Sequence, residues 1–290
     1  MSFADEEGTF LATLGSTAFC GELTGEAVQA ARDAAGRALP EALAAAGYAG
    51  RPPARLDRDR HVGFLELHIE QGPRLEAAGV RIGVVTGIAG MRRRVVAFTG
   101  RADHAGTTPM GRRRDAGAAL VRHAAAVGDV IAAHGGPDTV WNIGRIALEP
   151  GASNVVPGRA ELLLEHRDLD DAVMDGVNAA LEALEAQTAA ATGIGVQGTT
   201  VAARRGAATD ARLAGLLEAA AAEHGASSVR MPSGAGHDAR VLGRHVPAAM
   251  LFVPSIGGRS HDVAEDTAED DLVLGVQVLA TAVGALLDQA

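Results

Sequence analysis

Apolar and polar residues alternate most clearly in the segment 64–70. Its apolar residues share one face of an extended chain, namely Leu65, Leu67 and Ile69. Its polar residues share the other face, namely Glu66, His68 and Glu70. A period of two residues is typical of a β-strand with one buried face. We therefore predict a strand here, with His68 on the same face as two carboxylates.

The segment 87–202 has a regular succession of apolar patterns. They predict a strand ending with residues 94–99, a helix at 113–134, strands at 140–148 and 158–167, a helix at 171–191 and a strand at 194–202. The order βαββαβ is that of the ferredoxin-like arrangement, which can stand as an inserted domain.

The flanking segments predict a second domain. Residues 26–47 indicate an amphipathic helix interrupted near Pro40, and residues 210–225 and 270–289 indicate two more helices. Residues 248–253 form a continuous apolar run, as in a strand buried on both faces. We expect residues 1–86 and 203–290 to form one α/β domain, interrupted by the inserted domain 87–202.

Composition limits the classes of function. The chain has 290 residues, of which 47% are hydrophobic and 21% charged, enough to bury a sizeable core. A net charge of -10 with 3% aromatic residues argues against nucleic-acid binding. The basic runs 92–94 and 112–114 are therefore interpreted as solvated or interface arginines.

The single cysteine, Cys20, excludes an intramolecular disulfide and a thiolate zinc site, so any metal must be bound by His, Asp and Glu. No apolar run in the sequence reaches the length of a membrane span, and residues 1–7 lack the pattern of a signal peptide. We expect a cytoplasmic protein that does not associate with membranes.

Two segments near the start carry candidate chemistry. Glu6 and Glu7 are adjacent carboxylates, of which one can bind a metal while the other acts as general base. The alternative is a mobile acidic terminus. His68 lies at the end of a predicted strand, where ligands of α/β sheets gather. Its alternative is a surface histidine.

Further candidates follow in the middle of the chain. His104 lies in a loop of small and hydroxyl residues at 100–110, and its imidazole could stabilise an oxyanion. The same loop also fits a helix cap with Thr108 at the N-cap and Pro109 at the first helical position. Asn154 and Arg167 could bind a substrate carboxylate, or could be a turn residue and a strand-edge cation.

The last candidates are the segments 233–238 and 254–262. The second follows the buried strand 248–253 directly, and its glycines would let backbone N–H groups approach an anion. His261 could bind a metal and Arg259 a carboxylate. A glycine-rich surface loop is the alternative, which the coincidence of so many functional residue types at a strand end disfavours.

Taken in order, these segments resemble a known group of enzymes. Glu-Glu-Gly, Leu-His-Ile-Glu-Gln-Gly-Pro, Ala-Asp-His-Ala-Gly-Thr-Thr-Pro-Met, Ser-Gly-Ala-Gly-His-Asp-Ala and Ser-Ile-Gly-Gly-Arg-Ser-His are similar to motifs of the amidase branch of the M20 metallopeptidase-like superfamily. This branch contains allantoate amidohydrolases, N-carbamoyl-L-amino-acid hydrolases and β-ureidopropionases.

The resemblance implies a catalytic α/β domain with two divalent metal ions, zinc or manganese, and an inserted domain that forms a homodimer. It implies that Glu6 is the general base, and that the metal ligands are Glu7 and His261 for one ion and His68 for the other. It also implies that His104 stabilises the oxyanion of the substrate. Further substrate-binding residues implied by the resemblance are Gln71, Asn154, Arg167, His237, Gly258 and Arg259.

The resemblance further implies a His-x-Asp motif and a bridging Asp ahead of Glu6, and neither precedes it in this sequence. We therefore expect an N-terminally truncated chain that binds metal poorly. The expected activity is hydrolysis of a linear carbamoyl or ureido amide, such as allantoate or an N-carbamoyl amino acid, by metal-activated water. The alternatives are an aminoacylase or dipeptidase-like enzyme and an inactive dimerisation or binding module.

Overall fold

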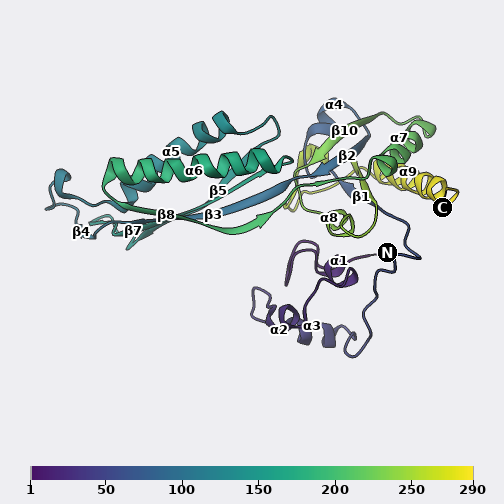
Figure 1. Ribbon diagram of the computed structural model, residues 1–290, viewed down its shortest axis with the longest axis horizontal. Coiled ribbons are helices and arrows are strands. Elements are labelled where there is room, and N and C mark those ends of the chain that lie inside the picture. Colours follow the sequence, from purple (N-terminus) through teal and green to yellow (C-terminus); the bar gives the residue numbers. More distant parts are fainter. Residues whose placement is uncertain (1, 290) are drawn as a thin grey trace. The chain divides into compact units, whose positions relative to one another are not determined.

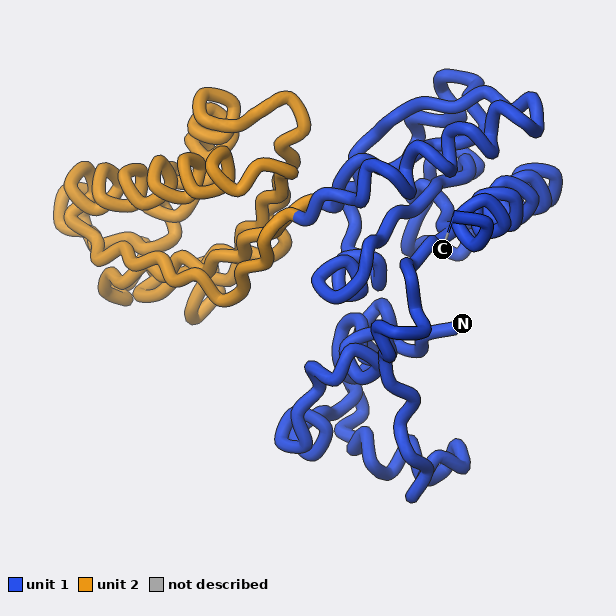
Figure 2. The backbone as a smooth tube through the Cα atoms, turned by 45° about the vertical axis from the view of Figure 1, so that its right-hand side comes forward, with its two compact units in different colours: residues 1–88, 207–290 blue, residues 89–206 orange. Residues whose placement is uncertain are grey.

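A computed structural model describes residues 2–289. The chain divides into two compact units, one of residues 1–88 and 207–290 and the other of residues 89–206 (Figure 2). The boundaries expected from the sequence were 86/87 and 202/203, against 88/89 and 206/207 in the structure. The first unit is thus assembled from two separate stretches of chain.

The second unit contains a four-stranded antiparallel sheet in the order β5-β7-β3-β8. Its strands are β3 (Gly90–Thr99), β5 (Val140–Glu149), β7 (Arg159–Asp168) and β8 (Gly195–Arg204). Helices α5 (Ala116–His134) and α6 (Asp171–Thr192) lie on the same side of this sheet and bury its apolar face (Figure 1). The predicted βαββαβ order is confirmed. Most predicted ends of these helices and strands lie within four residues of the observed ends.

The first unit contains a mixed sheet in the order β1-β11-β2-β10, with β9 beside β2. Its strands are β1 (Phe64–Ile69), β2 (Ile82–Ile88), β9 (Ala207–Ala208), β10 (Ser228–Ser233) and β11 (Ala248–Val253). Strand β1 runs parallel to β11, so both end at the same edge of the sheet. As predicted, the α/β class and the apolar strand 248–253 are present.

Helices cover both faces of this sheet. Helices α7 (Ala211–Glu223) and α9 (Glu269–Leu287) pack on the face that carries Leu65, Leu67 and Ile69. The other face packs against the short helices α4 (Arg74–Ala78) and α8 (Asp238–Leu242), and α1 (Leu14–Phe19) lies beside α8. The alternation of segment 64–70 therefore directs His68 away from the main core.

The helix predicted at 26–47 was wrong. The structure has two short helices, α2 (Gly25–Ala30) and α3 (Leu39–Ala45), separated by a turn that is closed by a bridge between Arg32 and Ala38. Pro40 lies in the first turn of α3, where a residue without an N–H costs no hydrogen bond. It therefore begins a helix and does not interrupt one.

Helices α5 and α9 are long and apolar enough to cross a membrane by length and composition alone, which the sequence analysis did not single out. Both pack against the sheet of their own unit, and core helices of soluble proteins meet the same criterion. The remaining short elements are β4 (Asp103–His104), β6 (Val155–Val156) and the 3₁₀ turns η1 (Met110–Arg112) and η2 (Ile256–Gly258).

Candidate metal centre

The candidate centre lies in the first unit, where β1 ends. His68 is the fifth residue of β1, and His237 is the N-cap residue of α8. Glu6 comes from a tight turn ahead of α1. The Asp5 carboxylate accepts the N–H groups of Phe10 and Leu11, at 2.9 and 3.0 Å, and closes this turn. The carbonyl of Glu6 accepts the N–H of Thr13 at 3.0 Å, which fixes the backbone from which its carboxylate projects.

Three donor atoms meet here. Glu6 Oε2 lies 3.8 Å from His68 Nε2, and Glu6 Oε1 lies 3.4 Å from His237 Nδ1. One ligand atom from each residue falls within 4.8 Å of the other two. In a tetrahedral zinc site with bonds of about 2.1 Å, ligand atoms lie about 3.4 Å apart. The spacing of the three side chains is therefore close to that of a metal site.

The hydrogen bonds of the two imidazoles are also those expected of metal-binding histidines. His68 Nδ1 lies 2.7 Å from the carbonyl oxygen of Ile69, and a carbonyl can only accept, so Nδ1 carries a proton and Nε2 is the ring nitrogen that faces Glu6. Metal-binding histidines commonly donate their second nitrogen to a backbone carbonyl in this way. His237 Nε2 is 2.7 Å from Ser233 Oγ, which leaves Nδ1 facing Glu6.

Two buried atoms of this cluster, Glu6 Oε1 and His237 Nδ1, have no hydrogen-bond partner among the described residues. Buried polar atoms are nearly always satisfied, so such a pair facing one another calls for a further partner. A divalent cation accepts a carboxylate oxygen and an imidazole lone pair together. The residues present therefore fit a metal ion.

Electrostatics around the cluster follow from burial and from opposite charge. Burial opposes ionisation of Glu6, but the imidazoles of His237 and His68 outweigh it and hold the pKa of Glu6 at about 2. Burial lowers the pKa of His237. Burial raises the pKa of Glu66 to about 7, although Glu66 accepts the N–H of Ala239 at 2.8 Å.

Glu7 and His261 form a second pair. Glu7 Oε2 lies 3.7 Å from His261 Nε2, and both side chains are largely exposed. Glu7 directly follows Glu6 in the chain. His261 has a φ of 55° and follows Gly257 and Gly258, whose φ values are 63° and 62°. A Cβ on Gly258 would come within 2.6 Å of Pro73, so this loop requires glycine there.

Two other predicted residues border these loops. Gln71 has a φ of 56°, and its N–H donates to Ser255 Oγ at 3.0 Å, which ties the end of β1 to the end of β11. The exposed guanidinium of Arg259 lies 3.4 Å from the Asp262 carboxylate. A weak, solvent-exposed ion pair of this kind can exchange for a substrate carboxylate at little cost.

His104 lies in the second unit, on β4. Its Nδ1 accepts the N–H groups of Gly106 and Thr107, at 3.1 and 3.2 Å, so a neutral ring carries its proton on the exposed Nε2. The imidazole is therefore a donor. The carbonyl of Asn154 accepts the N–H of Ala105 at 2.9 Å and holds this loop in place.

The alternative interpretation of this loop, a helix cap with Thr108 at the N-cap, is contradicted. Pro109 precedes the 3₁₀ turn η1, and the N-cap of α5 is Asp115, whose carboxylate accepts the N–H of Ala118 at 2.9 Å. Arg167 lies near the end of β7, as expected. Its Nε donates to Glu165 Oε1 at 2.8 Å, so the guanidinium is oriented by a neighbour on the same strand.

The sequence profile of "Peptidase family M20/M25/M40" matches residues 1–285. The chain belongs to this family. It is 34% identical to an N-carbamoyl-L-amino-acid amidohydrolase of Rhizobium meliloti, over 97% of this chain and 68% of the relative. It is 36% identical to the allantoate amidohydrolase of Bacillus subtilis, over 96% of this chain and 68% of the relative.

Among solved structures, an amidase of the hydantoinase/carbamoylase family from Burkholderia phymatum matches with a TM-score of 0.89 and 44% identity, over 98% of this chain and 69% of that one. The chain thus spans about two thirds of the length of these M20 relatives. The predicted membership in the M20 amidohydrolases, hydrolases of C–N bonds, is confirmed. The roles of individual residues stay predictions.

The close approach of His237 to Glu6 and His68 was not predicted from the sequence. His237 was predicted to be a substrate-binding residue, whereas in the structure it lies in the donor cluster. The available signal was the Gly-His-Asp run at 236–238. It could not be used because the strand that precedes it, β10, was not predicted.

Proposed function

We propose that this chain is a metal-dependent hydrolase of linear carbamoyl or ureido amides, with allantoate and N-carbamoyl amino acids as its substrate class. The names of the M20 relatives support the substrate class. The observation that carries metal dependence is the meeting of Glu6, His68 and His237, with two buried donor atoms unsatisfied among the described residues.

In this proposal Glu6, His68 and His237 hold one divalent ion, zinc or manganese, and Glu7 with His261 provides ligands for a second. A metal at such a site polarises a carbonyl and activates water. One carboxylate oxygen of Glu6 would hold the ion, and the other could take a proton released there, because the carboxylate is ionised. The reaction consumes one water and yields ammonia, carbon dioxide and the shortened amine or ureido acid.

We propose that hydrogen-bond donors of this chain bind the oxyanion and the carboxylate of the substrate. The Nε2–H of His104 suits a developing oxyanion, because Nδ1 is already held by two backbone N–H groups. Arg259, with Arg167 and Asn154, is proposed to bind the substrate carboxylate, and Gln71 and Gly258 to shape the loops around it.

The test is to incubate the purified chain with zinc or manganese and to measure bound metal and ammonia release from allantoate and from N-carbamoyl-L-amino acids. The sequence alone predicted weak metal binding, so the metal is supplied in excess. Because Glu6, His68 and His237 lie together, we expect metal-dependent turnover under this condition, and His68→Ala should lower it at least 100-fold. His134→Ala, in an exposed histidine of α5, is the matched control and should leave turnover unchanged.

Two outcomes would contradict the proposal. Preferred cleavage of dipeptides or N-acetyl amino acids would indicate an aminoacylase or dipeptidase-like enzyme. A chain that stays free of metal under these conditions and still dimerises would indicate a binding module. We further propose a cytoplasmic homodimer formed through residues 89–206, which sedimentation of the separate and full-length proteins and cell fractionation would test.

A further inference from the structure

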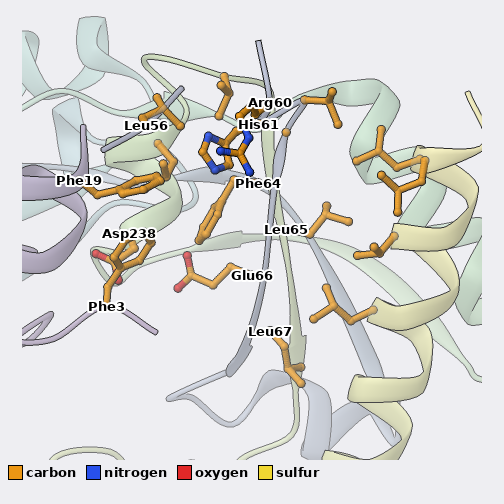
Figure 3. Close-up of a pocket in the computed structure, with 18 residues that line it drawn as sticks. Phe3, Phe19, Leu56, Arg60, His61, Phe64, Leu65, Glu66, Leu67 and Asp238 are labelled. Atoms are coloured by element: carbon orange, nitrogen blue, oxygen red, sulfur yellow. The ribbon is translucent and has the colours of Figure 1, made fainter. Parts of the chain in front are cut away.

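The two carboxylates that line a cavity of about 560 Å³ in the first unit, those of Glu66 and Asp238, are both engaged (Figure 3). Glu66 accepts the N–H of Ala239 at 2.8 Å, and Asp238 accepts the hydroxyl of Ser16. Neither carboxylate is therefore free to recognise a further ligand. In the second unit, by contrast, the half-buried cation of Arg113 is directed at the backbone of the loop that carries His104.

The guanidinium of Arg113 joins the two ends of the turn 105–108. Its Nε donates to the carbonyl of Thr108 at 3.1 Å, and its Nη2 donates to the carbonyl of Ala105. The N–H of Thr108 in turn donates to the carbonyl of His104 at 3.0 Å. A planar guanidinium with several donors in a fixed fork can hold two acceptors at once, which a lysine ammonium does less well.

The backbone from which this guanidinium extends is itself fixed. The N–H of Arg113 donates to the carbonyl of Met110 at 3.2 Å, at the end of η1. The carbonyl of the next residue, Arg114, accepts the N–H of Arg101 at 2.8 Å, and Asp115 then caps the 19-residue helix α5. Arg113 therefore reaches the His104 loop from the start of a long, regular element.

The contact with Ala105 acts on His104 through a single peptide bond. The carbonyl of Ala105 and the N–H of Gly106 belong to one trans peptide, so they point in opposite directions. With the carbonyl held by Arg113, the N–H of Gly106 points to His104 Nδ1, to which it donates at 3.1 Å. The positive guanidinium also polarises this peptide and strengthens the donation.

We propose that Arg113 is a positioning residue for the oxyanion donor of the reaction. It keeps the peptide 105–106 turned so that His104 Nδ1 accepts backbone N–H groups, which leaves the Nε2–H of His104 as a donor with a fixed direction. This inference rests on the proposed function, in which that Nε2–H stabilises the oxyanion. Such a donor lowers the barrier most when it is aimed before the reaction begins.

Kinetics of the full chain with metal in excess test this role. Arg113→Gln should lower kcat about tenfold to 100-fold and leave KM within about threefold, because misplacing a catalytic group by about 1 Å can cost about 100-fold. In a His104→Ala background the same substitution should lower kcat less than about twofold, because the donor that Arg113 positions is gone. Arg112→Gln removes an equal charge from the adjacent, exposed residue and should leave kcat unchanged.

A second measurement does not depend on turnover. Amide hydrogen exchange of Gly106 and Thr107 is followed by NMR in the full chain. Arg113→Gln should speed exchange at both amides about tenfold, the effect expected when one hydrogen bond is lost, and Arg112→Gln should not. The unfolding midpoint of the second unit, followed by the fluorescence of Trp141, should stay that of the parent. If Arg113→Gln does not fold, Arg113→Lys replaces it, since one ammonium cannot bridge both carbonyls.

Three results would overturn the inference. The first is unchanged exchange at Gly106 and Thr107 in Arg113→Gln. The second is an unchanged kcat in that variant. The third is an equal loss of kcat in the parent and in the His104→Ala background, which would show that Arg113 acts by another route. Absence of turnover in the parent would instead refute the proposed function, and the exchange rates would then decide whether Arg113 holds the His104 loop.

Discussion

Addition of metal should raise the thermal stability of the first unit, and the size of the effect follows from linkage. A ligand that binds only the folded state at 100 times its Kd stabilises by about 2.7 kcal/mol. For a unit of 150–250 residues, 1 kcal/mol shifts Tm by about 2–4 °C. With zinc at 100 times its Kd we therefore expect a rise of about 5–11 °C.

The arrangement of the ligands explains why metal binding should raise the Tm by this amount. Glu6, His68 and His237 already lie within 4.8 Å of one another in the described chain, so little reorganisation opposes binding. The rise is measured by differential scanning calorimetry in zinc titrations, with a chelator as the reference condition. His68→Ala should remove most of it, because two ligands would remain, whereas His134→Ala should not. A rise that is equal in His68→Ala and in the parent would refute the proposed site.

Three further outcomes are expected. Glu6→Gln should weaken zinc binding at least tenfold and lower turnover at least 100-fold; equilibrium dialysis beside the activity assay checks this, and lost turnover at unchanged metal content would assign Glu6 to proton transfer alone. Burial lowers the pKa of His123, so below about pH 6.5 the unfolded chain binds a proton that the folded chain does not, and the second unit should lose stability as the pH falls. Urea unfolding followed by the fluorescence of Trp141, the single tryptophan, should therefore have a lower midpoint at pH 5 than at pH 8, and equal midpoints would contradict this prediction. Arg94→Met should cost about 3–5 kcal/mol because it leaves the Glu185 carboxylate buried without its partner, and adding Glu185→Leu should recover much of that loss in the same unfolding assay.

The sequence predicted best where a single physical pattern dominated. Strand β1 was found because one of its faces is buried and the other is polar, and the inserted unit because its elements are long and regular. Strand β2 was missed because Gly83, Thr86 and Gly87 interrupt its apolar run. Strand β10 was missed because Pro232 and its polar first half hide the pattern, although its pairing with β2 stabilises it.

The site was predictable in its residue types and only partly in its geometry. Motif order pointed to Glu6, Glu7, His68 and His261, whose spacing in the chain says nothing about distance in space. The 3.7 Å between Glu7 and His261 depends on a loop with a left-handed backbone at three positions, which propensity alone does not forecast. His237 lies in the cluster because it is the N-cap residue of α8, and this five-residue helix is too short to be predicted from hydrophobic periodicity.

The division of the first unit into two stretches of chain sets an order of events during synthesis. Gln71 and Ser255 join through a hydrogen bond across 184 positions, and within residues 2–289 the partner of β1 is β11, which is made late. The second unit is continuous, so it can close while the ribosome is still adding the remaining strands. Until β11 is made, β1 and β2 cannot be joined in one sheet, because β11 lies between them, and apolar surface exposed in this interval can aggregate.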